Sequence, residues 1–161
     1  MNPSEYNKCV DDYADNLYRF ILKNIKDKDK AKDIVQDTFE KLWIKCPELE
    51  FSKAKSWMFT TGYRTMIDLI RREQKQGKFD EKEFSALSYE ENYSDLQEIL
   101  QRAVNRLPTD QKAVILLRDY EGYSYEEISK ISGLSEAQVK VYIFRARTFL
   151  KKYLGSIESL V

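Results

Sequence analysis

The sequence predicts an all-α protein of two small helical domains, joined by a flexible acidic linker. Only five glycines and three prolines occur in 161 residues, and apolar residues recur at helical spacing along nearly the whole chain. No stretch shows the apolar–polar alternation of a half-buried strand. We therefore expect a first domain over residues 1–77, the linker over 78–94 and a second domain over 95–161.

The first domain is expected to contain three amphipathic helices, near residues 5–26, 29–45 and 56–74. In the second of these, apolar or small residues recur at spacings of three and four and define one stripe. The members of this stripe are Ala31, Ile34, Val35, Thr38 and Leu42. A half of this size can form a small core but gains limited stability alone.

The linker is expected where helical periodicity is lost and five acidic residues stand against two lysines. This composition is typical of a solvated connection. Beyond it, a helix is predicted over 95–107, ended by Pro108, and another over 109–120. A helix-turn-helix completes the second domain.

Turn and capping residues indicate the helix-turn-helix between positions 124 and 152. Gly133 can adopt the positive φ that ends its first helix. Ser135 and Gln138 have the spacing of a capping box at the start of its second helix. Residues 135–154 carry five basic residues and one acidic residue, and apolar residues line one side. Such a helix suits phosphates and base edges, so this domain is predicted to bind DNA in the major groove.

Composition argues against several other classes of protein. The chain has no histidine, the commonest general acid–base group, and Cys9 and Cys46 form no CxxC pattern. No phosphate-binding glycine loop or metalloprotease motif occurs. We expect no catalytic residue, no metal and no cofactor. No apolar run approaches the ~20 residues of a membrane span, so we expect a cytoplasmic protein without direct membrane insertion.

The helix predicted over 29–45 has an acidic strip beside its apolar stripe. The strip consists of Asp33, Gln36, Asp37 and Glu40. It is either a solvated face balanced by neighbouring lysines or a docking surface for a basic partner helix, whose orientation charge complementarity would set.

Basic and aromatic residues interleave around the helix predicted over 56–74. Stacking aromatics and cations suit single-stranded or distorted DNA. The residues of this predicted DNA surface are Lys53, Lys55, Trp57, Thr60, Thr61, Arg64, Arg71 and Arg72. The alternative is a packed Trp57 with an ion pair between Arg64 and Asp68, four residues apart.

The last helix presents residues suited to reading duplex DNA. Glutamine suits adenine edges, lysine and arginine suit guanine, and apolar side chains can meet a thymine methyl group. The predicted readers are Gln138, Lys140, Val141, Phe144 and Arg145. Arg147 is predicted to contact phosphate. The alternative is a basic helix packed in a plain bundle.

Three segments in order carry a family resemblance: DIVQDTFEKLW, SWMFTTGYRTMIDLIRR and LPTDQKAVILLRDYEGYSYEEISKISGLSEAQVKVYIFRAR. Together they resemble bacterial RNA polymerase sigma factors of the extracytoplasmic-function group of the sigma-70-type family, from about residue 10 to residue 154. Within the third segment, VKVYIFRAR resembles members of this group from the Bacteroidetes lineage.

The resemblance implies an alternative sigma factor that binds core RNA polymerase and directs promoter recognition, melting and transcription initiation. The first segment matches the part that binds the clamp helices of the polymerase, which assigns that role to Asp33, Gln36, Asp37, Glu40 and Lys41. The loop 46–55 and the following helix match the part that melts the minus-ten element and captures a flipped base. The helix 135–147 matches the reader of the minus-thirty-five element.

The family also implies that the linker threads toward the RNA exit path of the polymerase and that an anti-sigma factor is a candidate partner. Gly62 and Arg64 stand where many relatives have alanine and asparagine, a departure from the family at positions that bear on how a flipped base is held. Two alternatives from the residues alone are a stand-alone helix-turn-helix regulator and an enzyme using carboxylates such as Asp33 and Asp37.

Overall fold

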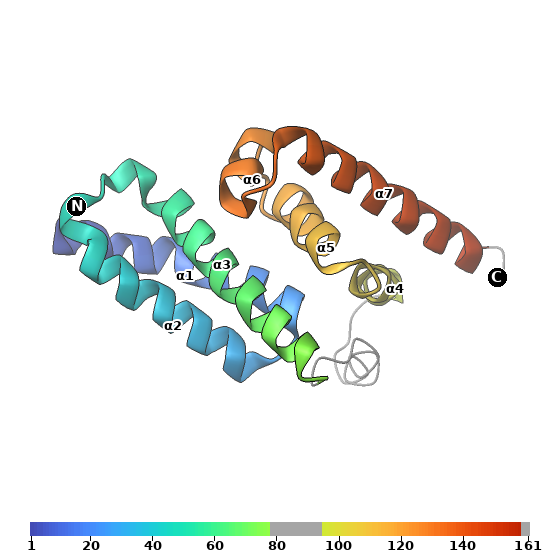
Figure 1. Cartoon of the computed structure of the whole chain (residues 1–161), viewed down its shortest axis with the longest axis horizontal. Coiled ribbons are helices and arrows are strands. Elements are labelled where there is room, and N and C mark those ends of the chain that lie inside the picture. Colours follow the sequence, from blue (N-terminus) through green and yellow to red (C-terminus); the bar gives the residue numbers. More distant parts are fainter. Residues whose placement is uncertain (78–94, 159–161) are drawn as a thin grey trace.

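The computed structural model describes residues 1–77 and 95–158, and the predicted linker at 78–94 lies outside the described residues. Within the described ranges the chain is all-helical, without strands. Figure 1 shows two groups of helices lying side by side, one from each half of the chain. This confirms the predicted fold class, while the flexibility and role of the linker remain predictions.

Three long helices form the first half. Their bounds are Pro3–Ile25 for α1, Lys28–Lys45 for α2 and Ala54–Lys75 for α3. Asn2 and Glu5 form a capping box at the start of α1, and the Asp27 side chain accepts a hydrogen bond from the Lys30 backbone N–H at the start of α2. Each cap satisfies backbone donors that have no partner within the helix. Two short 3-10 turns, Cys46–Glu48 and Phe51–Lys53, connect α2 to α3.

The second half contains shorter helices and one long C-terminal helix. The bounds are Asp95–Asn105 for α4, Thr109–Ile115 for α5, Tyr125–Ser132 for α6 and Glu136–Glu158 for α7. A π-helix, Leu116–Tyr120, continues α5. The prediction of one regular helix over 109–120 is therefore wrong in its last turn, where the Glu121 N–H donates to the Leu116 carbonyl at 3.1 Å.

The predicted helix-turn-helix is confirmed in its local details. Gly133 ends α6 with φ of 77°, and Ser124 and Glu127 form a capping box at its start. The Ser135 hydroxyl accepts from the Gln138 N–H at 3.1 Å, and Gln138 Oε1 accepts from the Ser135 N–H at 2.9 Å. These reciprocal bonds fix the start of α7 relative to the turn.

Apolar side chains from both halves form one connected core. In the first half α1, α2 and α3 pack against one another, and in the second half α7 packs against α4, α5 and α6. The halves also touch each other, because α3 packs against α6 and α1 contacts α5. Figure 1 shows α6 lying between α3 and α7.

Gly62 of α3 lies close to both other helices of the first half. A Cβ placed on it would be 3.0 Å from Leu17 Cδ1 of α1 and 3.5 Å from Thr38 Oγ1 of α2. Leu17 and Thr38 are both fully buried. Glycine therefore allows α1 and α2 to close around the middle of α3, the helix that carries most of the predicted minus-ten residues.

Candidate nucleic-acid and partner interfaces

The acidic strip of α2 faces solvent. Asp33, Gln36 and Glu40 are exposed, and Asp37 is half-buried. The Asp37 carboxylate forms an ion pair with Lys41 Nζ at 2.9 Å, one helical turn further on. Surface pairs of this kind contribute only about 0.3–0.5 kcal/mol to stability. Replacing Lys41 by a cationic side chain of a partner would therefore cost little free energy.

An apolar patch adjoins the acidic strip, and the sequence analysis did not single it out. Trp43 is 52% exposed and Ile44 is 79% exposed at the end of α2. The Tyr6 ring contacts the Trp43 indole, with ring centroids 5.0 Å apart. The position of Ile44 could have predicted this patch, because Ile44 is a large apolar residue outside the apolar stripe of its helix. Exposed large apolar side chains grouped beside charges are typical of protein-binding surfaces.

The predicted minus-ten residues divide between open and covered positions on and before α3. Lys53, Arg64, Arg71 and Arg72 are exposed. The remaining four, Lys55, Trp57, Thr60 and Thr61, are half-buried. The Thr60 hydroxyl donates to the Ser56 carbonyl of its own helix at 2.8 Å. Among the described residues no ion pair joins Arg64 to Asp68, so that part of the alternative interpretation is wrong.

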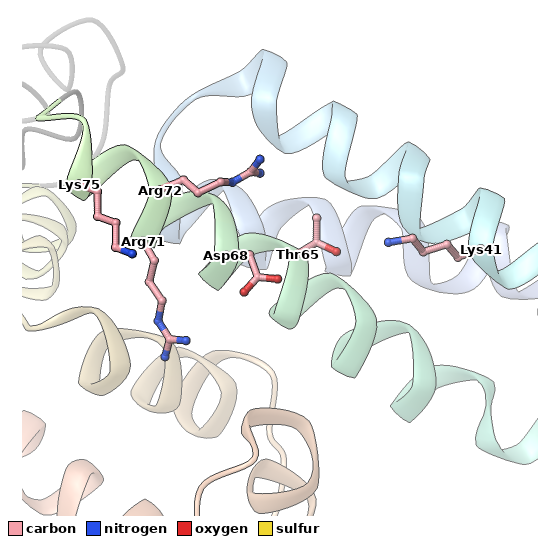
Figure 2. Close-up of a pocket in the computed structure, with 6 residues that line it drawn as sticks. All are labelled: Lys41, Thr65, Asp68, Arg71, Arg72 and Lys75. Carbon is pink, nitrogen blue, oxygen red and sulfur yellow. The ribbon is translucent and has the colours of Figure 1, made fainter.

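A basic hollow of about 520 Å³ lies along the outer side of α3. Its lining consists of Lys41, Thr65, Asp68, Arg71, Arg72 and Lys75. Figure 2 shows Arg72 directed toward α2 and Arg71 directed away from it, so the two guanidinium groups lie on different sides of α3. Four cations and one carboxylate make this hollow electropositive, which suits a phosphate backbone.

One covered residue of this surface, Lys55, contacts the second half of the chain. Lys55 Nζ lies 5.0 Å from the centroid of the Tyr123 ring and 5.7 Å from that of Tyr13. Phe59 and Tyr63, the aromatic residues of the next two turns of α3, are buried. The sequence pattern predicted Lys55 as part of the DNA surface. It did not predict that Tyr123 of the other half would cover Lys55.

The predicted reading face of α7 is open. Its buried side consists of Val139, Ile143 and Ala146. All the predicted readers and the predicted phosphate contact are exposed, namely Gln138, Lys140, Val141, Phe144, Arg145 and, for phosphate, Arg147. Phe144 is 71% exposed, which is costly for an apolar ring unless a ligand covers it.

Two of these side chains are already held in place. The Arg147 guanidinium donates to Asp119 Oδ1 at 2.7 Å, and this hydrogen bond raises the pKa of Arg147. Lys140 Nζ lies 3.8 Å from the Glu136 carboxylate and 5.7 Å from the centroid of the Tyr125 ring. Ordering these flexible cations in advance reduces the entropy lost when a ligand binds.

Residues 1–77 and 95–158 contain neither a metal-binding cluster nor a membrane-spanning helix. No group of three or more histidine, cysteine or acidic side chains is arranged to hold a metal ion there. None of the helices in these ranges combines the length and apolar character needed to cross a bilayer.

The fold and its surfaces define a class: a two-part helical DNA-binding protein whose second part is a helix-turn-helix and whose first part presents an exposed acidic strip. Comparison with known families makes this specific. Residues 9–76 match the model of Sigma-70 region 2, and residues 97–150 match that of Sigma-70, region 4.

Known proteins give the same result. The chain is 31% identical to the ECF RNA polymerase sigma factor SigM of Bacillus subtilis, over 86% of this chain and 88% of SigM. It is 31% identical to sigma factor SigV of the same organism, over 89% and 87%. The ECF sigma-E factor of Haemophilus influenzae is 26% identical, over 91% and 85%.

A solved structure agrees in fold across both halves. The sigma factor RpoE of Bartonella quintana, crystallised with the anti-sigma factor NepR, matches with a TM-score of 0.74 and 27% identity, covering 93% of this chain and 96% of RpoE. The chain belongs to the extracytoplasmic-function sigma factors of the sigma-70 family. It is an alternative sigma factor that directs transcription initiation. The match of the first half to region 2 excludes the alternative of a stand-alone helix-turn-helix regulator.

Proposed function

We propose that residues 1–77 bind core RNA polymerase and the melted minus-ten element, while residues 95–161 bind the minus-thirty-five duplex. The observation that supports this most strongly is the opposite chemistry of α2 and α7. One presents exposed carboxylates beside Trp43 and Ile44, and the other presents exposed cations around Phe144. A protein partner and a DNA partner are therefore assigned to different helices.

Binding to polymerase is assigned to the acidic strip of α2. Asp37 would exchange its weak pair with Lys41 for a cation of the partner, while Trp43 and Ile44 would lose exposed apolar area. At about 25 cal/mol per Å² of buried apolar surface, such aromatic and aliphatic side chains supply affinity. The carboxylates Asp33, Asp37 and Glu40 would set orientation and the rate of association.

Binding to the melted strand is assigned to α3 and the turn before it. The phosphates would lie along Lys53, Arg71 and Arg72, which are exposed. Unpaired bases would stack near Lys55 and Trp57, where base–aromatic stacking contributes ~1–3 kcal/mol per base. Gly62 packs against α1 and α2 and offers no side chain to DNA. The exposed Arg64 would therefore contact the flipped base or its backbone.

Binding to the upstream duplex is assigned to the exposed face of α7. The N-terminal residues Gln138, Lys140 and Val141 would meet base edges, and Phe144 would pack on a thymine methyl group or a sugar. Arg147, aligned by Asp119, would contact a phosphate and set the register of the helix.

The two halves would act together on one promoter. Each half raises the effective concentration of the other once both are held by polymerase, so weak contacts become specific. The linker at 78–94 is assigned to the path toward the RNA exit channel. The chain supplies specificity, and the polymerase supplies the bond chemistry.

Three finer assignments complete the proposal. RpoE binds NepR, and this similarity supports an anti-sigma factor as a partner of the present chain too. A cytoplasmic location follows from partnership with polymerase. The similarity of VKVYIFRAR to Bacteroidetes members is the basis for proposing that lineage as the source.

The polymerase assignment is tested by Asp37→Arg in a pull-down with purified core polymerase. Charge reversal in the strip is expected to abolish binding, while helix content by circular dichroism stays unchanged because the lost ion pair is exposed. Asp11→Arg is the matched control, since Asp11 is exposed on α1, outside the strip. Normal binding by Asp37→Arg, or equal loss in the control, would contradict the assignment.

The duplex assignment is tested with Lys140→Ala and Arg145→Ala. Each is expected to weaken binding to an upstream-element duplex by roughly tenfold or more, the effect of losing ~1–3 kcal/mol of base contact. Core binding should persist in both. Lys130→Ala, on the exposed face of α6, is the control. Loss of core binding in the α7 variants would indicate misfolding rather than lost recognition.

A further inference from the structure

We propose that Tyr125, the first residue of α6, is a positioning residue for duplex binding: its ring holds cations of the α7 reading face in place before DNA arrives. This inference rests on the proposed assignment of α7 to the upstream duplex. It adds to that assignment a residue that acts on DNA through its neighbours and does not itself read a base.

Tyr125 differs in its surroundings from the other members of the apolar stripe of α6. Ile128 and Ile131 follow it at intervals of three residues and are buried in the core. Tyr125 begins the same stripe but is only half-buried. Figure 1 shows α6 beside the beginning of α7, against which it packs. One part of the Tyr125 side chain therefore packs on the core, and the rest lies among the cations that flank this junction.

Arg118 is the cation that fixes the ring. Its Cζ lies 4.5 Å from the centroid of the Tyr125 ring, a distance typical of a cation–π contact. Its Nη1 donates to the Tyr123 carbonyl at 2.8 Å. A guanidinium held at both points cannot rotate freely, so Arg118 and Tyr125 orient each other. Because Arg118 belongs to the π-helix Leu116–Tyr120, this contact also ties the start of α6 to the helix before it.

Lys140 is the first DNA-facing cation that the ring restrains. Its Nζ lies 5.7 Å from the centroid of the Tyr125 ring and 3.8 Å from the Glu136 carboxylate. An exposed ion pair within one helix restrains a lysine only weakly. The ring supplies a second point of attachment on a different helix, so it reduces the number of conformations available to the Lys140 side chain.

Arg147 is the second such cation. It donates to Asp119 Oδ1 at 2.7 Å, and the nearby Tyr125 hydroxyl helps to raise its pKa. Asp119 directly follows Arg118 in the π-helix. Arg147 lies seven residues after Lys140, about two turns further along the same side of α7. The ring of Tyr125 and the carboxylate of Asp119 thus hold two cations of one helix side from outside that helix.

A neutral ring suits this role better than a carboxylate would. An acidic residue at position 125 would attract the cations more strongly, but it would also repel the phosphates of the DNA. The negative face of an aromatic ring attracts a cation without carrying a net charge. Tyr125 can therefore order Lys140 and Arg147 at no electrostatic cost to DNA binding.

The test measures binding of the full chain, by fluorescence anisotropy, to a duplex that the wild type has selected from a pool of randomised sequence. Tyr125→Leu removes the ring but keeps an apolar residue in the stripe, whereas Tyr125→Phe keeps the ring and removes the hydroxyl. Tyr153→Leu is the matched control. Arg106 Cζ lies 5.0 Å from the centroid of the half-buried Tyr153 ring, near the far end of α7, so this change removes a similar contact away from the reading face.

Tyr125→Leu should weaken duplex binding by roughly tenfold, the effect of having to order two long side chains on binding. Tyr125→Phe and the control should keep the wild-type affinity, and circular dichroism verifies that all variants remain folded. An equal loss in Tyr125→Phe and Tyr125→Leu would show that the hydroxyl contacts DNA directly and would overturn the proposal. An equal loss in the control would do the same.

A combination of variants shows whether Tyr125 acts through the cations. In a chain that already carries Lys140→Ala and Arg147→Ala, adding Tyr125→Leu should change the affinity by less than about twofold, because no cation is left to position. A ring that only stabilises the fold would cause the same loss in both backgrounds, and that result would contradict a positioning role.

A spectroscopic measurement on the free chain needs no DNA. The ring current of Tyr125 should shift the Arg118 Nε–H proton upfield in the NMR spectrum, because the guanidinium stands over the ring. Tyr125→Phe should keep this shift and Tyr125→Leu should lose it. A wild-type chain without the shift would overturn the proposal even if Tyr125→Leu proved unable to fold.

The outcomes separate this inference from the proposed function. If the wild type selects no duplex, or if Lys140→Ala combined with Arg147→Ala leaves duplex binding unchanged, the assignment of α7 fails and the positioning role falls with it. If that combination weakens binding while Tyr125→Leu alone does not, the assignment of α7 stands and the positioning role fails.

Discussion

Gly62→Val is the substitution that most directly probes how α3 is held in position. The added Cβ would stand 3.0 Å from Leu17 Cδ1, so that Leu17 must shift slightly, and 3.6 Å from Ile21 Cδ1, which is ordinary van der Waals contact. Both neighbours are fully buried and cannot move into solvent. The two further methyl groups of valine must then displace α1 or α2.

The expected cost follows from two opposing effects. Overpacking a dense core costs about 1–3 kcal/mol. Replacing a glycine inside a helix regains about 0.5 kcal/mol of helix propensity. The net loss in the free energy of unfolding should be about 0.5–2.5 kcal/mol. With an m-value near 2 kcal/mol per molar urea, the unfolding midpoint should fall by about 0.25–1.25 M.

The measurement is urea unfolding followed by helical circular dichroism. Gly155→Val is the matched control, because Gly155 is exposed in α7 with no atom near its added Cβ, and it should change stability by less than ~0.5 kcal/mol. Leu17→Ala combined with Gly62→Val should cost less than the sum of the single changes, since the deleted side chain makes room. Additive costs, or a Gly62→Val variant as stable as the wild type, would refute the packing argument.

Three further predictions concern charge and capping. Lys26→Gly should stabilise the fold by ~1 kcal/mol, because Lys26 has φ of 59°, a left-handed conformation that penalises a side chain. Burial lowers the pKa of Lys26 from 10.5 to about 8. The charged form of Lys26 therefore destabilises the fold fully below pH 8, and this penalty decreases as pH rises toward 10.5. The stability gained by Lys26→Gly, measured by thermal unfolding, should accordingly shrink between pH 7 and pH 10. Ser135→Ala should cost ~1 kcal/mol through loss of the cap and weaken upstream-duplex binding in a gel-shift assay. Arg71→Ala and Arg72→Ala should each reduce the salt slope of single-strand binding by ~0.7, measured by anisotropy, whereas Lys8→Ala should leave it unchanged.

Helix bounds and caps could be predicted from the sequence, because they depend on residues that are close together in the chain. The ends of α2 and α3 fall within two residues of the predicted bounds, and Gly133 and Ser135 have the conformations their residue types favour. The capping box of Asn2 and Glu5 has the same sequence spacing and could have been found in the same way.

Contacts between the halves were not predictable from pattern. Tyr123 and Phe59 lie 64 positions apart; Phe59 fits the apolar stripe of α3 and Tyr123 lies in the turn before α6, whether or not they meet. The covering of Lys55 and the burial of Lys112 could not be predicted from the sequence either, because their spacing resembles that of lysines on any solvated helix face. Periodicity shows which face of a helix is apolar, whereas a pairing between distant helices is decided by the shapes of both.

The π-helix at the end of α5 has a consequence for how this chain tolerates change in length. A π turn contains one residue more than an α turn, and here it covers Leu116–Tyr120, just before the Tyr123 N–H that donates to the Leu117 carbonyl at 3.1 Å. Deleting one residue in this stretch would restore regular winding yet rotate Asp119 away from Arg147 on one side and Glu121 away from Arg19 on the other. Loss of a single codon there would remove both the Asp119–Arg147 pair to α7 and the Glu121–Arg19 pair to α1.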